Sequence, residues 1–290
     1  MNATPFFSVI IPVFNAENYL RKAVESALQF HCVKEVLLIE DASPDNALAL
    51  CEKLAEEDDR VKVFTHPNNE NKGAGASRNL GIEKSTCDFI AFLDADDWYL
   101  PNRFDAEKEL FKDINVDGVY GATGLYYQNR KSIDDKMYTL EPNIAPQDLL
   151  YEIIRPHGGE FSTNAITIKK KLFNKVGLFD TNLRLHQDSE LWCRLAYYGV
   201  LINGIVSEPI AFARVHSENR ISNRNRSSLN KYHTKQFFTF LKLKKTDKKV
   251  LRIMFKSYII NKSKSNNKII RICNVVFELF KTPIIFLKLL

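Results

Sequence analysis

The sequence has few cysteines and lacks the patterns that usually make them structural. Its five cysteines occur singly, with no Cys-x-x-Cys pair. This argues against a zinc framework or a disulfide scaffold and favours a reducing compartment. The amino-terminal residues have no basic region, and their short apolar run contains Pro12. We therefore predict no signal peptide and a cytoplasmic location.

Long apolar runs are also missing near the carboxyl end. Segments 268–281 and 283–290 are interrupted by charged residues and a proline, which argues against a transmembrane helix there. The composition as a whole excludes a disordered protein, because 45% of the 290 residues are hydrophobic and 11% are aromatic. A chain of this length holds one large domain, or one domain with an appendage.

Negative charge is nearly absent from the last part of the chain. Residues 220–290 contain 18 basic residues (Lys and Arg) and two acidic residues, whereas residues 1–219 contain 23 basic and 33 acidic residues. This asymmetry predicts two parts with different partners, which we place at 1–220 and 221–290. We interpret the second part as a basic amphipathic helical extension that contacts an anionic membrane surface. The alternative is a small helical domain whose basic face is only solvated, and no nucleic-acid-binding module is recognised.

Strand patterns alternate with helical patterns through the first hundred residues. This alternation predicts an α/β fold with a mostly parallel sheet flanked by helices. Strands are expected at 7–12, 35–40, 61–65 and 89–93, and helices at 16–28, 44–57 and 75–84. Further along, strands are expected at 118–129, 136–140, 165–168 and 208–215, and helices at 146–154 and 187–198.

Polar residues gather where the first four predicted strands end, at 12–15, 40–43, 66–75 and 94–97. Ligands of parallel sheets bind at the carboxyl ends of the strands. We therefore expect one binding site at this edge of the sheet.

Three carboxylates within four positions follow the strand at 89–93. Residues two apart on an extended chain point to the same side, so Asp94 and Asp96 are expected to face one space. Like charges held this close need a cation or a shifted pKa, and a divalent metal ion is the simplest answer. The alternative is a polar loop in which Asp97 caps a helix over 99–111.

Five stretches resemble the family 2 glycosyltransferases of GT-A fold. They are 8–15 (SVIIPVFN), 39–45 (IEDASPD), 75–81 (GASRNLG), 92–97 (FLDADD) and 188–191 (DSEL), in the family's order. The resemblance covers about residues 6–220. It implies a nucleotide-sugar donor, most often a UDP-sugar, and inversion at the anomeric carbon.

The resemblance also implies roles for individual residues. The nucleotide part of the donor would contact Pro12, Val13, Asn15, Asp41, Arg78 and Asp94. A Mn²⁺ or Mg²⁺ ion would be bound by Asp96 and Asp94, with His216 as a further ligand of the metal or the diphosphate. Such an ion neutralises the charge that grows on the leaving diphosphate. The sequence departs from the family at Ala42, where a glycine is usual.

Asp188 matches the family's general base, which deprotonates the acceptor hydroxyl. The residue before it is Gln187, where the family has glutamate, and the alternative role for Asp188 is a helix cap. The sequence thus predicts an inverting, metal-dependent glycosyltransferase at the cytoplasmic face of a membrane, acting on a glycan or glycolipid acceptor. Two other functions stay open: a nucleotidyltransferase, and a non-enzymatic membrane-bound scaffold on the same fold.

Overall fold

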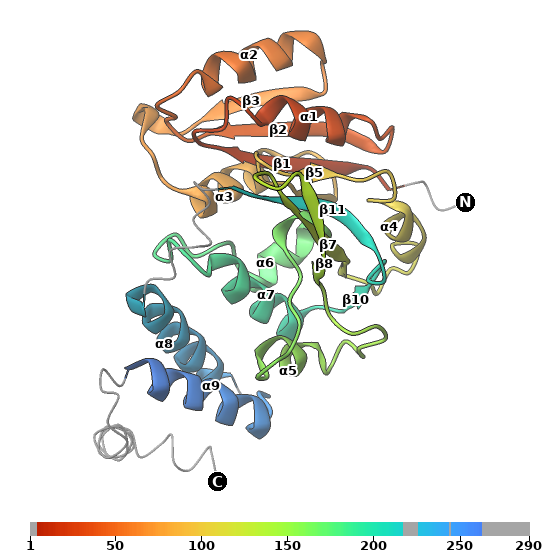
Figure 1. The fold of residues 1–290 in the computed structure, drawn as a ribbon. Helices are drawn as coiled ribbons and strands as arrows, with labels where there is room; N and C mark the ends of the chain where they lie inside the picture. Colours follow the sequence, from red (N-terminus) through yellow and green to blue (C-terminus); the bar gives the residue numbers. More distant parts are fainter. Residues whose placement is uncertain (1–4, 217–225, 244, 263–290) are drawn as a thin grey trace.

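The computed structural model describes residues 5–216, 226–243 and 245–262 (Figure 1). The strands are β1 (Phe7–Val13), β2 (Val33–Glu40), β3 (Val61–Thr65), β4 (Phe89–Phe92), β5 (Trp98–Tyr99), β6 (Gly118–Tyr120), β7 (Ala122–Tyr127), β8 (Ser132–Tyr138), β9 (Ile166–Lys169), β10 (Leu201–Asn203) and β11 (Pro209–Val215). They form a seven-stranded sheet of order β10-β6-β9-β4-β1-β2-β3 and a four-stranded sheet of order β5-β11-β7-β8.

Helices cover both faces of the larger sheet (Figure 1). They are α1 (Leu20–Leu28), α2 (Ala47–Glu57), α3 (Ala74–Lys84), α4 (Asp105–Leu110), α5 (Leu149–Ile154), α6 (Phe173–Val176), α7 (Gln187–Tyr198), α8 (Arg226–Lys242) and α9 (Lys248–Lys262), with 3₁₀ turns at Pro67–Asn69, Thr163–Ala165 and Lys170–Leu172. In the large sheet β1 pairs in parallel with β2 and β4, and β2 with β3, whereas β9 is antiparallel to β4 and β6. The predicted mostly parallel α/β fold is confirmed.

The alternation of side chains along β1 divides the interior into two cores. Phe7, Val9, Ile11 and Val13 pack on the face covered by α1 and α2. Ile10 points to the other face, where it packs in the core that also contains side chains of α3 and α7. All five are fully buried, as the two-residue period of a strand covered on both sides requires.

Several predicted helices begin later than expected. The helices expected from residues 44 and 146 begin at Ala47 and Leu149. The helix expected from residue 16 begins at Leu20, because Asn15 has a left-handed φ of 53° and residues 17–19 form a turn. The helix proposed over 99–111 does not form from Tyr99, since Trp98 and Tyr99 pair as a strand with Phe212 and Ala211 of β11. The helix in this region is α4, which begins at Asp105 after Pro101.

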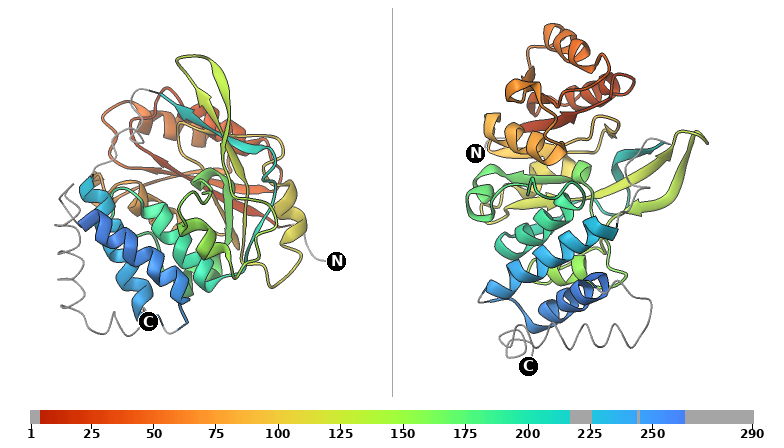
Figure 2. Two further views of the ribbon diagram at one scale, coloured as in Figure 1. Left: turned by 60° about the horizontal axis from the view of Figure 1, so that its bottom comes forward. Right: turned by 90° about the vertical axis from the view of Figure 1, so that its left-hand side faces the viewer.

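Helices α8 and α9 pack side by side at the end of the molecule opposite α1 and α2 (Figures 1 and 2). Their apolar side chains, including Phe237, Phe240, Met254 and Tyr258, belong to the same core as Trp192 of α7. Within the described ranges, no helix has both the length and the apolar character needed to cross a bilayer. The division at residue 220 stays a prediction, and segments 268–281 and 283–290 lie outside the described residues.

Candidate active site

A pocket of about 460 Å³ opens at the carboxyl ends of β1, β2 and β4. All the residues predicted to bind the donor or the metal line it, namely Pro12, Val13, Asn15, Asp41, Arg78, Asp94, Asp96 and His216. The sheet brings them together because β1, β2 and β4 run in parallel and therefore end at one edge. Asp188, the predicted base, is not among the lining residues.

The acidic residues 94–97 form a turn directly after β4, closed by a hydrogen bond from the Asp97 amide to the Asp94 carbonyl at 3.0 Å. The Asp94 carboxylate accepts a bond of 2.6 Å from Arg78 Nη2. The Asp96 carboxylate lies 3.1 Å from His216 Nε2. Burial, together with the charge of Asp94, raises the pKa of Asp96. Asp94 and Asp96 therefore each have a different basic partner in the pocket.

Asp97 connects the turn to the rest of the fold. It is 6% exposed, and its carboxylate accepts bonds from the Arg214 amide at 2.7 Å and from Asn164 Nδ2 at 2.6 Å. Burial, with the charges of Asp96 and Asp94, raises the pKa of Asp97 well above its usual range. Asn164 also accepts a bond from the Asp94 amide at 2.9 Å, so one amide side chain holds both ends of the acidic turn.

The chemistry of the acidic turn suits a hard divalent cation, because Asp94 and Asp96 are oxygen ligands whose mutual repulsion such an ion would relieve. The three predicted ligands do not form a ready-made site. Among the residues that the structure describes, no three His, Cys, Asp or Glu side chains are placed to hold a metal ion. Two of the predicted ligands, Asp96 and His216, are in contact, whereas Asp94 pairs with Arg78.

Asp41 is almost fully buried, and its carboxylate holds the loop that follows β3. It accepts bonds from the amides of Lys72 at 2.7 Å and Gly73 at 2.8 Å. The preceding Glu40 accepts the amides of Ala42 and Ser43, and Ala42 has a left-handed φ of 55°. A glycine adopts that φ without strain, which explains why one is usual in the family here.

Arg78 is the most enclosed cation in the pocket. It is 6% exposed, and its Nε has no hydrogen-bond partner among the described residues. Its guanidinium lies 5.5 Å from the ring of Phe179 and donates to Asp94. A buried donor left unsatisfied in a pocket suits an anionic or carbonyl-bearing ligand.

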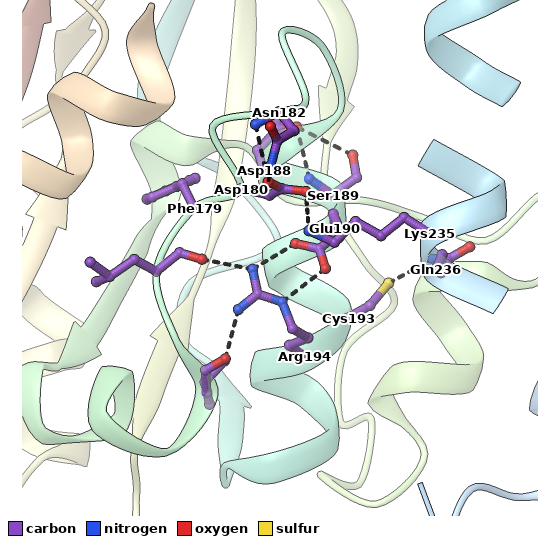
Figure 3. Close-up of polar contacts among 12 residues, drawn as sticks. Phe179, Asp180, Asn182, Asp188, Ser189, Glu190, Cys193, Arg194, Lys235 and Gln236 are labelled. Atoms are coloured by element: carbon purple, nitrogen blue, oxygen red, sulfur yellow. Dashed lines mark hydrogen bonds and ion pairs between the residues drawn. The ribbon is translucent and has the colours of Figure 1, made fainter. Parts of the chain in front are cut away.

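Asp188 lies half-buried in the first turn of α7 and is not one of the residues that line the pocket. Its Oδ1 accepts the amide of Ser189 at 2.7 Å (Figure 3). The neighbouring Gln187 packs on α3, so closely that a Cβ at Gly75 would lie 1.9 Å from its Oε1. Since Ala74 lines the pocket, the start of α7 touches the helix that forms one wall.

Two residues that line the pocket and one that supports it were missed by the sequence analysis. Arg214 lines the pocket, lies over the rings of Tyr19 and Trp98 at 4.8 and 5.0 Å, and donates from Nε to the Asp96 carbonyl. Tyr19 lines the pocket too, and Asn164 holds the acidic turn. Arg214 lies two residues before His216, which was the only local signal for it. Asn164 lies in the 3₁₀ turn Thr163–Ala165 and has no such signal beside it.

Comparison with known proteins places the chain in a family. Residues 8–177, more than half of the chain, match the family described as Glycosyl transferase family 2. An uncharacterized glycosyltransferase of Rickettsia bellii is 32% identical over 203 residues, which cover 66% of this chain and 27% of that protein. Glycosyltransferase GlyG of Streptococcus pneumoniae is 28% identical over 198 residues, or 62% of this chain and 64% of that protein. The chain thus spans less than two thirds of either relative.

Solved structures of S. aureus TarS share the fold. TarS 1–349 matches 95% of this chain, and 80% of its own, with a TM-score of 0.67 at 16% identity. The complex of TarS 1–349 with UDP-GlcNAc matches 91% of this chain, and 74% of its own, with a TM-score of 0.67 at 17% identity. This likeness confirms the predicted GT-A architecture. The motifs and the fold of the chain, together with the family match, show that the chain belongs to glycosyl transferase family 2.

Proposed function

We propose that the protein transfers a sugar from a nucleotide-sugar donor, a UDP-sugar, to a hydroxyl acceptor with inversion at the anomeric carbon. One observation carries the proposal: eight residues from five separate parts of the sequence line one pocket, and they are the residues expected to bind the donor and its metal. The solved complexes of TarS with UDP and with UDP-GlcNAc, proteins of the same fold, support the choice of UDP.

Each part of the pocket has a role in this proposal. Pro12, Val13, Asn15 and Asp41 contact the nucleoside, and Arg78 binds the diphosphate or the base. Asp94 and Asp96, with His216, would hold a Mn²⁺ or Mg²⁺ ion, which acts as a Lewis acid toward the leaving diphosphate when bound. Asp41 is well suited, because its two backbone donors fix the carboxylate and leave lone pairs on each oxygen for the nucleoside.

Asp188 acts as the general base. Its carboxylate takes the proton of the acceptor hydroxyl as that oxygen attacks the anomeric carbon, and the bond from this carbon to the diphosphate oxygen breaks on the opposite side. The first turn of α7 suits a general base. The helix fixes the backbone of Asp188, and its half-exposed carboxylate can be reached by an incoming acceptor.

The proposal is tested by calorimetry of UDP-, GDP- and dTDP-sugars with Mn²⁺, followed by assay of nucleotide release. Asp96→Asn should weaken donor binding, because the diphosphate loses its counter-ion. Asp188→Asn should keep donor binding and lower turnover by about 10²–10⁴-fold. If no sugar nucleotide binds to the wild-type protein, the chain is a scaffold on this fold and the enzymatic proposal fails.

We also propose that the acceptor is a glycan or glycolipid and that the protein works at an anionic membrane surface. Exposed basic side chains lie at the end of α8, in the turn that follows and along α9: Lys242, Lys245, Lys248, Lys249, Arg252 and Lys256. The apolar faces of α8 and α9 pack in the core. The membrane contact that we propose for these two helices is therefore electrostatic. Each such group contributes about 1 kcal/mol near an anionic surface.

Sedimentation with phosphatidylserine vesicles tests the membrane contact. Lys248→Glu with Lys249→Glu should release the protein at low salt, whereas the matched pair Lys34→Glu with Lys53→Glu, on exposed positions of β2 and α2, should not. Equal release by both pairs, or no binding by the wild-type protein, would reject an α9 surface as the membrane contact.

A further inference from the structure

We propose that Asn79 and Arg194 are positioning residues, which set the place of Asp188 relative to the donor pocket by fastening segment 176–179 between α3 and α7. The inference rests on the proposed function, since it assigns these two residues to the alignment of donor and base. Neither residue lines the pocket. Their contacts, however, join the helix that carries Arg78 to the helix that carries Asp188.

The attachment to α3 is made by one amide side chain. Asn79 Nδ2 donates to the Phe179 carbonyl at 2.9 Å, and the Phe179 amide donates to Asn79 Oδ1 at 2.9 Å. The pair of bonds satisfies both polar groups of a backbone unit that belongs to no strand or helix. Asn79 directly follows Arg78, which lines the pocket. The bonds of Asn79 therefore fix the backbone of residue 179 relative to the donor site.

The attachment to α7 is made by one guanidinium. Arg194 donates to the carbonyls of Val176 at 2.7 Å and Leu178 at 2.8 Å. Its Nε and Nη2 also donate to the carboxylate of Glu190, one turn earlier on the helix, at 2.9 and 2.6 Å (Figure 3). The Glu190 side chain is 2% exposed and that of Arg194 is 11% exposed. Such bidentate, charge-assisted bonds hold a guanidinium in one orientation.

Packing supports the same alignment. The ring of Phe179 lies against Phe92 of β4 at 5.6 Å and Trp192 of α7 at 6.1 Å between ring centres. Gln187, next to Asp188, fills the space that Gly75 of α3 leaves open. The two helices therefore meet at their amino-terminal turns and are also tied through segment 176–179. Asp188 cannot move away from α3 without breaking one of these contacts.

Helix α8 supports this segment from the outside. Lys235 of α8 forms an ion pair with Asp180, the next residue of the segment, and Asp180 also accepts the amide of Asn182 at 3.0 Å. Asp180 and Lys235 lie close together in Figure 3, near the start of α7. The residue that follows segment 176–179 is thus held by α8.

A purely structural role and a positioning role differ in what they change. Loss of a structural contact lowers thermal stability and weakens every activity in parallel. Misplacement of a base leaves the donor pocket intact, and displacements near 1 Å can cost about 10²-fold in rate. The two roles are therefore separated by comparing donor affinity with turnover in the same folded variant.

The experiment uses the full chain, with the sugar nucleotide that the wild-type protein turns over. Asn79→Ala and Arg194→Ala are expected to lower kcat for nucleotide release by about 10–100-fold, with the donor Kd from calorimetry within about twofold of wild type. Arg60→Ala, whose guanidinium likewise donates to a carboxylate (Asp58) and to the carbonyls of Phe30 and Leu28, and Arg21→Ala, whose bidentate partner Glu57 is on the surface, are the matched controls. Both controls should keep kcat within about twofold.

More conservative variants provide the same test if replacement by alanine prevents folding. Asn79→Asp keeps the acceptor for the Phe179 amide and loses the donor, and Arg194→Lys loses the fork; both should lower kcat with an unchanged Kd. The inference is overturned if folded variants keep wild-type kcat, or if Kd weakens in proportion to the loss of kcat. Absence of donor binding by the wild-type protein would instead reject the proposed function.

Discussion

Replacement of Glu35 by Gln should make the protein less stable at neutral pH and less sensitive to acid. Glu35 is fully buried at the amino-terminal edge of the sheet. Its carboxylate accepts bonds from Ser8 Oγ at 2.6 Å, the Thr86 amide at 2.5 Å and Lys62 Nζ at 2.6 Å. It thereby joins β1, β2, β3 and the segment before β4, and the opposite ends of β1, β2 and β4 form the pocket.

The pKa of Glu35 gives the size of the effect. Burial raises this pKa, but the bonds from Lys62, Ser8 and Thr86 outweigh it and lower the pKa from 4.5 to about 2. At about 1.4 kcal/mol per pKa unit, the ionised form is favoured by about 3 kcal/mol in the folded state. The side chain of Lys62 is 43% exposed, and solvent screening of that ion pair reduces the expected contribution to about 2–3 kcal/mol.

The sign of the pH dependence follows from the lowered pKa. The stabilisation is complete above pH 4.5, where the unfolded chain is also ionised, and it is lost as the pH falls toward 2. Roughly half should be gone at pH 3. Gln keeps an acceptor for Ser8 and Thr86 but cannot pair with Lys62, so the variant should lack this acid-dependent term.

Urea unfolding at pH 7, 5, 4 and 3 and constant ionic strength measures the difference. The free energies of unfolding of wild type and Glu35→Gln should differ by about 2–3 kcal/mol at pH 7 and by roughly half as much at pH 3. Glu57→Gln, which removes an exposed pair with Arg21, is the control and should change stability little at either pH. A difference that stays constant from pH 7 to pH 3 would refute the assignment of the lowered pKa.

Two further predictions concern the packing around the pocket. Asn164→Ala should lower stability by about 1–3 kcal/mol, because the Asp94 amide loses its acceptor and buried Asp97 loses a donor, and it should also weaken UDP binding by calorimetry. An unchanged UDP affinity in a folded variant would separate Asn164 from the site. Gly81→Ala should cost about 1–3 kcal/mol in urea unfolding, because its Cβ would lie 2.4 Å from Ile10 Cγ2 in the core. The exposed neighbour Glu83→Ala should cost little, and equal losses would reject the overpacking argument.

Much of the fold was predictable because many of its elements carry their own periodic signal. The strand at 61–65 and the helix at 187–198 were predicted with the bounds that the structure shows. The convergence of the pocket residues followed from one rule, that parallel strands end at one edge. The positions that failed depend on distant partners: Trp98 is a strand residue because Phe212, more than a hundred residues later, pairs with it.

The last helices show a different limit of sequence reasoning. An apolar face on a basic helix looks the same whether it covers lipid or protein, because the pattern records the face and not its partner. The apolar side chains of segments 237–243 and 250–260 pack in the hydrophobic core that also contains side chains of α7, and Phe237 and Phe240 are buried there. Their charge remains outside, on the opposite side. The membrane prediction therefore rests on the basic side chains and on segments beyond residue 262.

The acidic turn shows how far a motif can be separated from the residues that hold it. Arg103, which is fully buried, donates to the carbonyls of Asn164 at 3.0 Å and Ile166 at 3.1 Å and pairs with Glu107. Asn164 in turn holds Asp97 and the Asp94 amide. A local pattern identifies the acids, because they interrupt an apolar strand, but it gives no sign of this support. A variant that keeps every family motif and loses Arg103 should therefore lose the geometry of the acidic turn.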